Sequence, residues 1–200
     1  SNSVPHLTPV SDRYNAKIIK GKENIIIGFL GRLHESKGIQ PLMDAFEKYW
    51  NLFPRENVIL KIAGEGDQKN RIIKLANQYV NCEYLGEIGY DEIDAFIQTT
   101  TVMIIPSISD NLVTVGIETL MHQKPLIISN NTGLSEYLRP NYDCIAIDST
   151  SENIFQIICQ ITKDKINLQN ISENGRKTFL KNFTINDYCQ QMNIITGLNV

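Results

Sequence analysis

Short runs of apolar, mostly β-branched residues alternate along this chain with longer amphipathic stretches, and this alternation limits the folds open to it. The run Ile25–Leu30 (Ile-Ile-Ile-Gly-Phe-Leu) is typical of a strand that is buried on both faces. It is followed by 39–50, where apolar residues recur at helical spacing. Strands that alternate with helices of this length predict βαβ units and therefore parallel strands.

Five more apolar runs and six more amphipathic stretches continue the pattern. Strands are expected over 58–63, 82–85, 102–105, 125–128 and 143–147, and helices over 67–76, 91–98, 115–121, 151–163, 168–182 and 184–196. Asp67 is expected to cap the first of these helices. The sequence thus predicts an α/β fold, a doubly wound parallel sheet of about six strands with helices on both faces. Ligands of such folds bind where the strands end, so the site is expected in the loops after Leu30, Ala63, Leu85, Ile105 and Ile128.

Charge and cysteine content exclude several other classes of protein. With 19 basic and 22 acidic residues the net charge is −3, and Lys and Arg form no basic block, which argues against a nucleic-acid partner. No apolar run approaches the roughly 18–20 residues that a membrane helix needs. The four cysteines lie far apart without metal-ligand spacing, which favours free thiols, a cytoplasmic setting and no bound metal.

The chain is expected to hold one folded domain. Residues 1–21 show no clear periodicity and begin with Ser-Asn-Ser, which indicates a tag remnant followed by an interdomain linker. Residues 22–200 carry all of the strand and helix signals. We therefore expect a domain over 22–200 that belongs to a longer protein.

The loop after the first strand combines glycines with cations. Gly31-Arg32-Leu33-His34-Glu35-Ser36-Lys37-Gly38 leads directly into a helix. Its two glycines would let the backbone approach a ligand, and Arg32 and Lys37 add positive charge where a helix N-terminus already favours anions. This arrangement could hold a diphosphate; the alternative is an exposed basic pair beside Glu35.

Two carboxylates stand in and after the loop that follows the fourth strand. Asp110 lies in the loop, and Glu118 lies on a mostly apolar helix, where a carboxylate needs a partner. The hydroxyls of a ribose or another sugar could be that partner for Glu118, and the alternative is a hydrogen bond to backbone. For Asp110 the alternative is capping of the following helix, shared with Asn111 and Thr114.

Together these segments resemble the donor-binding half of GT-B glycosyltransferases, closest to family 4, the glycosyl transferases group 1. The resemblance spans about 25–187 and keeps the order of the family's motifs. Its pieces are Gly31-Arg32-Leu33 with Lys37-Gly38, Gly64-Glu65-Gly66, Tyr84-Leu85-Gly86, Pro106-Ser107, the carboxylates Asp110 and Glu118, Lys124-Pro125-Leu126-Ile127 and Gly133-Leu134-Ser135-Glu136. The resemblance implies a Rossmann-like domain that binds a nucleotide-diphosphate sugar, a UDP- or GDP-sugar, as substrate and needs no cofactor.

The resemblance also implies roles for individual residues. Arg32 and Lys37 would hold the diphosphate, Glu118 the ribose hydroxyls and Asp110 the transferred sugar, and these four would form the catalytic set. The implied donor-binding residues are Gly31, Arg32, Lys37, Gly64, Gly66, Ile88, Asp110, Leu112, Val113, Thr114 and Glu118. Members of the family retain anomeric configuration, so a retaining, metal-independent hexosyltransferase is implied.

This sequence departs from the family's pattern at several positions. Asp110 replaces the usual Glu, Gln123 occupies a usual Gly position, and Thr132 replaces the first Gly of the later motif. The Asp-Asn-Leu variant resembles a branch among bacterial surface-polysaccharide enzymes.

Nothing in the chain matches the family's N-terminal domain, which binds a glycan or lipid-linked acceptor. The chain alone is therefore expected to be inactive, and the full protein to be cytoplasmic or peripheral to the inner membrane. The alternatives are a nucleotide-sugar epimerase of GT-B fold and a non-catalytic doubly wound binding module.

Overall fold

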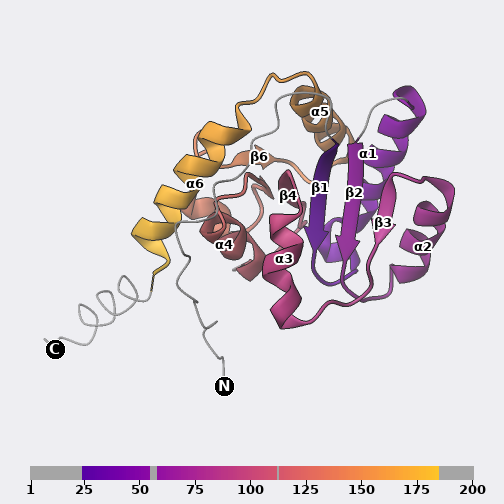
Figure 1. Cartoon of the computed structure of the whole chain (residues 1–200), viewed down its shortest axis with the longest axis horizontal. Coiled ribbons are helices and arrows are strands. Elements are labelled where there is room, and N and C mark those ends of the chain that lie inside the picture. The colour runs from indigo at the N-terminus through magenta and orange to yellow at the C-terminus, as the bar shows by residue number, and fades with distance from the viewer. Residues whose placement is uncertain (1–23, 55–57, 112, 185–200) are drawn as a thin grey trace, which may run out of the picture.

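A six-stranded parallel sheet forms the centre of the computed structural model, which describes residues 24–54, 58–111 and 113–184. The strands are β1 (Ile25–Leu30), β2 (Val58–Ala63), β3 (Cys82–Tyr84), β4 (Val102–Ile105), β5 (Leu126–Ser129) and β6 (Ile145–Ile147). Their order across the sheet is β3-β2-β1-β4-β5-β6, and all five neighbouring pairs are parallel. The strand order therefore reverses between β1 and β4 (Figure 1).

Helices cover both faces of this sheet (Figure 1). They are α1 (Ile39–Leu52), α2 (Lys69–Gln78), α3 (Ile93–Gln98), α4 (Thr114–Met121), α5 (Ser151–Thr162) and α6 (Leu168–Asn182). Helix α1 packs on α5, and α4 packs on α6. Short 3₁₀ turns, η1 (Glu35–Lys37), η2 (Tyr90–Glu92) and η3 (Gly133–Tyr137), precede α1 and α3 and follow β5.

Successive side chains of the central strands enter two separate apolar cores. In β4, Val102 and Ile104 pack with residues of α1 and α5, whereas Met103 and Ile105 pack with residues of α3, α4 and α6. Because neighbouring side chains of a strand point to opposite faces, a strand covered on both sides must be apolar at every position. This is the reason for the unbroken apolar runs in the sequence.

The structure confirms the predicted doubly wound fold, its six strands and helices on both faces. The capping prediction for Asp67 is wrong, because α2 begins at Lys69 and its N-cap is Gln68, with no side-chain cap. The helix predicted over 184–196 lies outside the described residues except for its first position. No helix in the described ranges is both long and apolar enough to cross a membrane.

The connection from α4 to β5 forces a left-handed backbone conformation on Gln123. Helix α4 ends in a Schellman motif, in which the Lys124 amide donates to Thr119 O and the Gln123 amide donates to Leu120 O, both at 3.1 Å. Gln123 has φ of 53°, a conformation that disfavours side chains other than those of Gly and Asn. Gly, which the family resemblance leads one to expect at this position, would adopt this conformation without strain.

Replacing Gln123 by Gly should stabilise the domain. Gly removes the free-energy cost of the left-handed conformation, and this exceeds the cost of the more flexible unfolded chain that Gly also brings. We therefore expect the free energy of unfolding to rise by about 0.5–1 kcal/mol, measured by urea denaturation. Asn141→Gly is the matched control, because Asn141 has a similar φ of 62° but Asn tolerates this conformation. An equal gain from both variants would contradict the explanation.

Candidate functional site

The reversal of strand order places two loops side by side at the carboxyl edge of the sheet. The chain leaves β1 toward α1 on one face and leaves the adjacent β4 toward α4 on the other. In doubly wound folds ligands bind in the crevice that opens at such a reversal. The N-terminal ends of α1 and α4 both start from these loops, and helix N-termini carry partial positive charge.

The two loops are held together by backbone contacts. The amide of Ile108 donates to Ser36 O at 2.8 Å, and a Cβ on Gly38 would overlap the carbonyl oxygen of Pro106. Gly38 also has φ of 71°. The expectation that Gly38 lets a ligand approach is therefore wrong, because Pro106 already occupies that space. At Gly31 a Cβ would meet only the ring of Phe29, at 3.7 Å, so this glycine remains free for the predicted close approach.

Lys37 and Asp110 join the same two loops through an ion pair. The Lys37 ammonium donates to the Asp110 carboxylate, and the side chains are 28% and 17% exposed. The Ser107 hydroxyl also donates to this carboxylate, at 3.5 Å. The capping alternative for Asp110 is wrong, because the N-cap of α4 is Val113 and no side chain caps the helix.

The backbone of Asp110 is bonded to the loop that follows β5. Its amide donates to Asn131 O at 3.4 Å, and its carbonyl accepts from the Gly133 amide at 3.1 Å. A Cβ on Gly133 would approach the Asn111 carbonyl oxygen to 2.6 Å. The loops after β1, β4 and β5 therefore form one packed unit.

Arg32 adds an exposed cation to this edge. Its side chain makes no hydrogen bond or ion pair with any residue in the described part of the chain. The guanidinium group is always protonated and donates to anions in a planar fork, which suits phosphate. The structure thus leaves Arg32 available to an anion at the carboxyl end of β1.

Glu118 lies in the second turn of α4, close to the same edge. Among the described residues its Oε2 atom is the one buried side-chain oxygen or nitrogen without a hydrogen-bond partner. Burial raises the pKa of this carboxyl, and the negative charge of Asp94 raises it further. The alternative expectation, a hydrogen bond from the backbone to Glu118, is therefore not met at Oε2. This oxygen can accept a hydrogen bond from a ligand.

A polar cluster behind Glu118 was not predicted from sequence. His122, one turn beyond Glu118, bonds through Nε2 to Asp94 at 2.7 Å and through Nδ1 to the Gln98 amide at 3.0 Å. Lys124 donates to the carbonyls of Gln98 and Thr100, both at 2.8 Å. These bonds fasten α3 to α4, and only their tertiary proximity could have revealed them.

The other predicted site residues lie along the same edge with different exposure. A Cβ on Gly64 would overlap the Gly31 carbonyl, and one on Gly66 would overlap that of Leu33, so these two glycines pack the loops together. Ile88 is half-buried against the core under α3 and α4, as is Val113. Thr114 is exposed at the start of α4. Leu112 lies outside the described residues.

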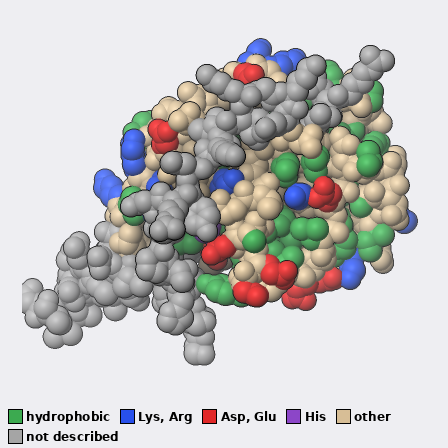
Figure 2. All heavy atoms as spheres, in the orientation of Figure 1, with side chains coloured by type: hydrophobic (Ala, Val, Ile, Leu, Met, Phe, Trp, Pro, Cys, Tyr) green, Lys and Arg blue, Asp and Glu red, His purple; other side chains and the backbone are tan. Residues whose placement is uncertain are grey.

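Charge is unevenly distributed around this edge. Exposed acidic residues lie just before α3 or in its first turn: Glu87, Asp91, Glu92 and Asp94. Figure 2 shows acidic side chains gathered on the lower part of the face in view. Arg32 and Lys37 stand instead at the reversal point. A phosphate group is therefore favoured at the loops after β1 and β4 rather than beside α3.

Other reactive groups of the described residues do not form a second site. No three His, Cys, Asp or Glu side chains lie close enough there to hold a metal ion. Burial raises the thiol pKa of Cys82 and Cys144 to about 12, so both are neutral thiols near pH 7. They are free cysteines, as predicted.

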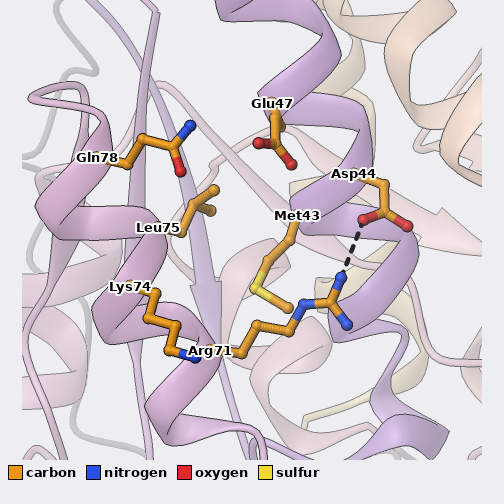
Figure 3. A pocket seen from close by; sticks show the side chains of 7 residues that line it. All are labelled: Met43, Asp44, Glu47, Arg71, Lys74, Leu75 and Gln78. Atoms are coloured by element: carbon orange, nitrogen blue, oxygen red, sulfur yellow. Dashed lines mark hydrogen bonds and ion pairs between the residues drawn. The ribbon is translucent and has the colours of Figure 1, made fainter.

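A pocket of about 160 Å³ lies between α1 and α2, and all of its lining residues belong to these two helices (Figure 3). Its charged side chains come from both helices, and Arg71 contacts Asp44 at 3.4 Å across it. Cations and carboxylates are mixed in its wall. This pocket offers no net charge to a phosphate and is distinct from the reversal point.

The fold and the placement of these loops define a Rossmann-like domain with its candidate site at the reversal of strand order. The chain belongs to the glycosyl transferases group 1 family, whose profile matches residues 10–178. It is 24% identical over 159 residues to the uncharacterized glycosyltransferase MJ1178 of Methanocaldococcus jannaschii, which covers 78% of this chain and 43% of that relative. The chain thus spans less than half of the length of this curated relative.

Solved glycosyltransferase structures share the fold. Anabaena Alr3699/HepE, crystallised with UDP and glucose, superposes with a TM-score of 0.72 at 17% identity, over 88% of this chain and 49% of HepE. The C-terminal domain of the group 1 glycosyltransferase LpcC from Francisella tularensis has a TM-score of 0.69 at 16% identity, over 80% of this chain and 87% of that domain. The predicted resemblance to the GT-B glycosyltransferases is confirmed.

Gly38→Ala should destabilise the domain more than Gly86→Ala. Both residues have nearly the same φ, 71° and 73°, but a Cβ on Gly38 overlaps Pro106 whereas none lies within 4 Å at Gly86. We expect a loss of about 2–4 kcal/mol for Gly38→Ala and about 1 kcal/mol for Gly86→Ala, measured by chemical denaturation. Equal losses would mean that loop packing at Gly38 is unimportant.

Glu118→Gln should raise the melting temperature of the ligand-free protein at pH 7.5. The pKa of Glu118 is raised on folding, so folding favours its neutral form and keeping the charge at higher pH costs stability. The gain should shrink as the pH falls toward about 4.5 and should be lost below that value, where the carboxyl is protonated in both the folded and the unfolded state. A thermal melt at each pH measures this.

Glu152→Gln is the control for that series. Hydrogen bonds from Lys48 and Gln156 lower the pKa of Glu152, so its removal should not raise the melting temperature at pH 7.5. A gain with Glu152→Gln but none with Glu118→Gln would contradict the assignment of Glu118 as an unpartnered buried carboxylate.

Proposed function

We propose that this chain is the donor-binding domain of a retaining, metal-independent glycosyltransferase that takes a UDP- or GDP-sugar. The observation that carries the proposal is the meeting of two cations, two helix N-termini and the unpartnered Glu118 oxygen at one edge of the sheet. Membership of the glycosyl transferases group 1 family supports the reaction class. HepE, which shares the fold, binds UDP and glucose, and this supports a nucleotide sugar as ligand.

The diphosphate would bind between the loops after β1 and β4. Arg32 is exposed at this point, and Lys37 stands on the adjoining 3₁₀ turn. Each charge-assisted hydrogen bond to a phosphate oxygen contributes about 1.5–3 kcal/mol. The starts of α1 and α4 add amide donors and positive potential on either side.

The ribose would bind to Glu118. A ribose presents two hydroxyl donors, and Oε2 is a buried acceptor that lacks a donor. Burial raises the pKa of this carboxyl, whereas hydrogen bonds from two hydroxyls would stabilise its charged form. Ligand binding would thus satisfy a group that costs free energy in the empty domain.

The remaining contacts follow the resemblance to the family. Asp110 would accept from hydroxyls of the transferred sugar, with the backbone of 113–114 beside it. The backbone around Ile88 would lie near the base, at the α3 end of the site, where the surface is acidic and disfavours phosphate.

The protein would promote transfer by stabilising the departing diphosphate. Arg32 and the helix N-termini are in place before the donor binds, and Lys37 would join them once it has turned from Asp110 to the bound phosphate. None of these groups would then need to reorganise as negative charge develops on the leaving oxygen. Attack from the same face, with the phosphate as base, would retain the configuration at the anomeric carbon. No acid–base residue of this chain is required in that step.

The acceptor would be held by a separate N-terminal domain, and the whole enzyme would build a bacterial surface polysaccharide or glycoconjugate. The role of residues 1–21 as interdomain linker, a cytoplasmic or membrane-peripheral location and a glycan or lipid-linked acceptor belong to this proposal. This domain alone would bind the donor but transfer no sugar, because the acceptor groups would be supplied by the other domain.

Arg32→Ala should weaken nucleoside diphosphate binding by about 1.5–3 kcal/mol, or roughly 10- to 150-fold in Kd, because one charge-assisted contact is lost. A thermal-shift panel of UDP, GDP, ADP and their sugars, UDP-glucose included, first identifies the nucleotide. Isothermal titration calorimetry with that nucleotide then measures both proteins.

Arg71→Ala is the matched control, because Arg71 is an exposed arginine on α2 that pairs with Asp44 outside the site. The affinity of Arg71→Ala for the nucleoside diphosphate should equal that of the wild type. Equal affinities for Arg32→Ala and wild type would refute the role of Arg32. A panel in which no nucleotide shifts the melting temperature would favour a non-catalytic module, and an epimerised donor recovered from the full-length protein would favour an epimerase.

A further inference from the structure

One of the two cations proposed for the diphosphate is already neutralised in the empty site. Lys37 donates to Asp110, whereas Arg32 has no partner among the described residues. Both members of the pair are more than two-thirds buried, so solvent screens their interaction only in part. A phosphate that binds Lys37 must therefore compete with the Asp110 carboxylate.

The backbones on both sides of this pair are fixed. Asp110 is bonded through its amide and carbonyl to the loop after β5, and its carboxylate accepts from Ser107. Both chain neighbours of Lys37 are held as well. Gly38 packs against the Pro106 carbonyl, and the Ser36 carbonyl accepts from the Ile108 amide. The backbone therefore keeps the short Asp110 side chain at the site when a ligand arrives, and the longer, flexible lysine side chain can exchange partners.

This arrangement distinguishes a free nucleoside diphosphate from one that carries a sugar. The terminal phosphate of the free diphosphate has an additional ionisable oxygen, so it meets greater repulsion from a fixed carboxylate. A sugar replaces that charge by an ester and brings hydroxyl donors, which Asp110 can accept once Lys37 has turned to the phosphate.

We propose that Asp110 is a specificity-determining residue that holds Lys37 in the empty site and lowers the affinity for a free nucleoside diphosphate relative to the corresponding nucleotide sugar. The inference rests on the proposed function of this site. It implies that the carboxylate favours release of the diphosphate product after transfer, besides contacting the donor sugar.

The test compares UDP with UDP-glucose, and GDP with GDP-mannose, by calorimetry on the 200-residue chain. In Asp110→Asn the Kd for the free diphosphate should fall by about three- to tenfold, because Lys37 is released and the repulsion is removed. The Kd for the nucleotide sugar should change less, so the preference for the sugar-bearing ligand narrows. Asp110→Glu, which keeps the charge, is the matched control and should show no such gain.

A double-mutant cycle with Lys37→Met separates release of Lys37 from the general loss of negative charge. In the Lys37→Met background, Asp110→Asn should increase diphosphate affinity by a smaller factor than in the wild type. Asp110→Ala serves as a second neutral variant, and a thermal melt confirms that each protein is folded.

The outcomes separate this inference from the proposed function. If the wild type binds neither UDP, GDP nor their sugars, both the proposed function and this inference are refuted. If the wild type binds a nucleotide but folded Asp110→Asn and Asp110→Ala bind the free diphosphate no more tightly, only the role of Asp110 is overturned. An equal gain in affinity for the free diphosphate and for the corresponding nucleotide sugar would likewise show that Asp110 does not discriminate between them.

Discussion

The candidate site depends on the close packing of the loops after β1 and β4 where the order of strands reverses. The two loops diverge to opposite faces of the sheet, yet Gly38 lies directly against the Pro106 carbonyl and Ile108 bonds to Ser36. This contact sets Lys37 opposite Asp110 and brings the loops that lead into α1 and α4 together at the same point of the sheet's edge. The sheet and its two cores provide the rigid support, and the loops supply the chemistry.

Two groups at this edge suit a ligand, and one of them, the buried Glu118 carboxylate, is unfavourable in the empty domain. Glu118 keeps a buried oxygen without a donor, and Arg32 is a cation without a partner in the described structure. A ligand that carries both negative charge and hydroxyl groups would satisfy both. Folded proteins pair most of their buried polar groups, so the exceptions indicate where binding is expected.

Family membership and site chemistry limit the function to different degrees. The profile match over 10–178 places the chain among the glycosyl transferases group 1, and the likeness to HepE and LpcC is a likeness of fold. The chain spans less than half of its curated relative MJ1178. Family membership therefore supports the reaction class, and the proposed choice of donor rests on the residues at the reversal of strand order.

The sequence by itself determined the architecture, because a strand buried on both faces must be apolar at every position and a covering helix only on one stripe. The run over 25–30 and the helical spacing over 39–50 appear in the structure as β1 and α1, and the motif order identified the family. Predictions from short segments were wrong at two positions. Asp67 does not cap α2, and the space beside Gly38 is taken by Pro106 rather than by a ligand.

Only the tertiary structure decided which side chains meet. The pairing of Lys37 with Asp110, 73 positions apart, and the bond between His122 and Asp94 leave no periodic or local signal in the sequence. For Glu118 the apolar helix did indicate a buried carboxylate in need of a partner, but only the tertiary structure shows that its Oε2 atom has none and that Asp94 of α3 lies near it. The physical reason is that hydrogen bonds and charge interactions act over a few ångströms in space, whereas sequence patterns report only which face of an element is buried.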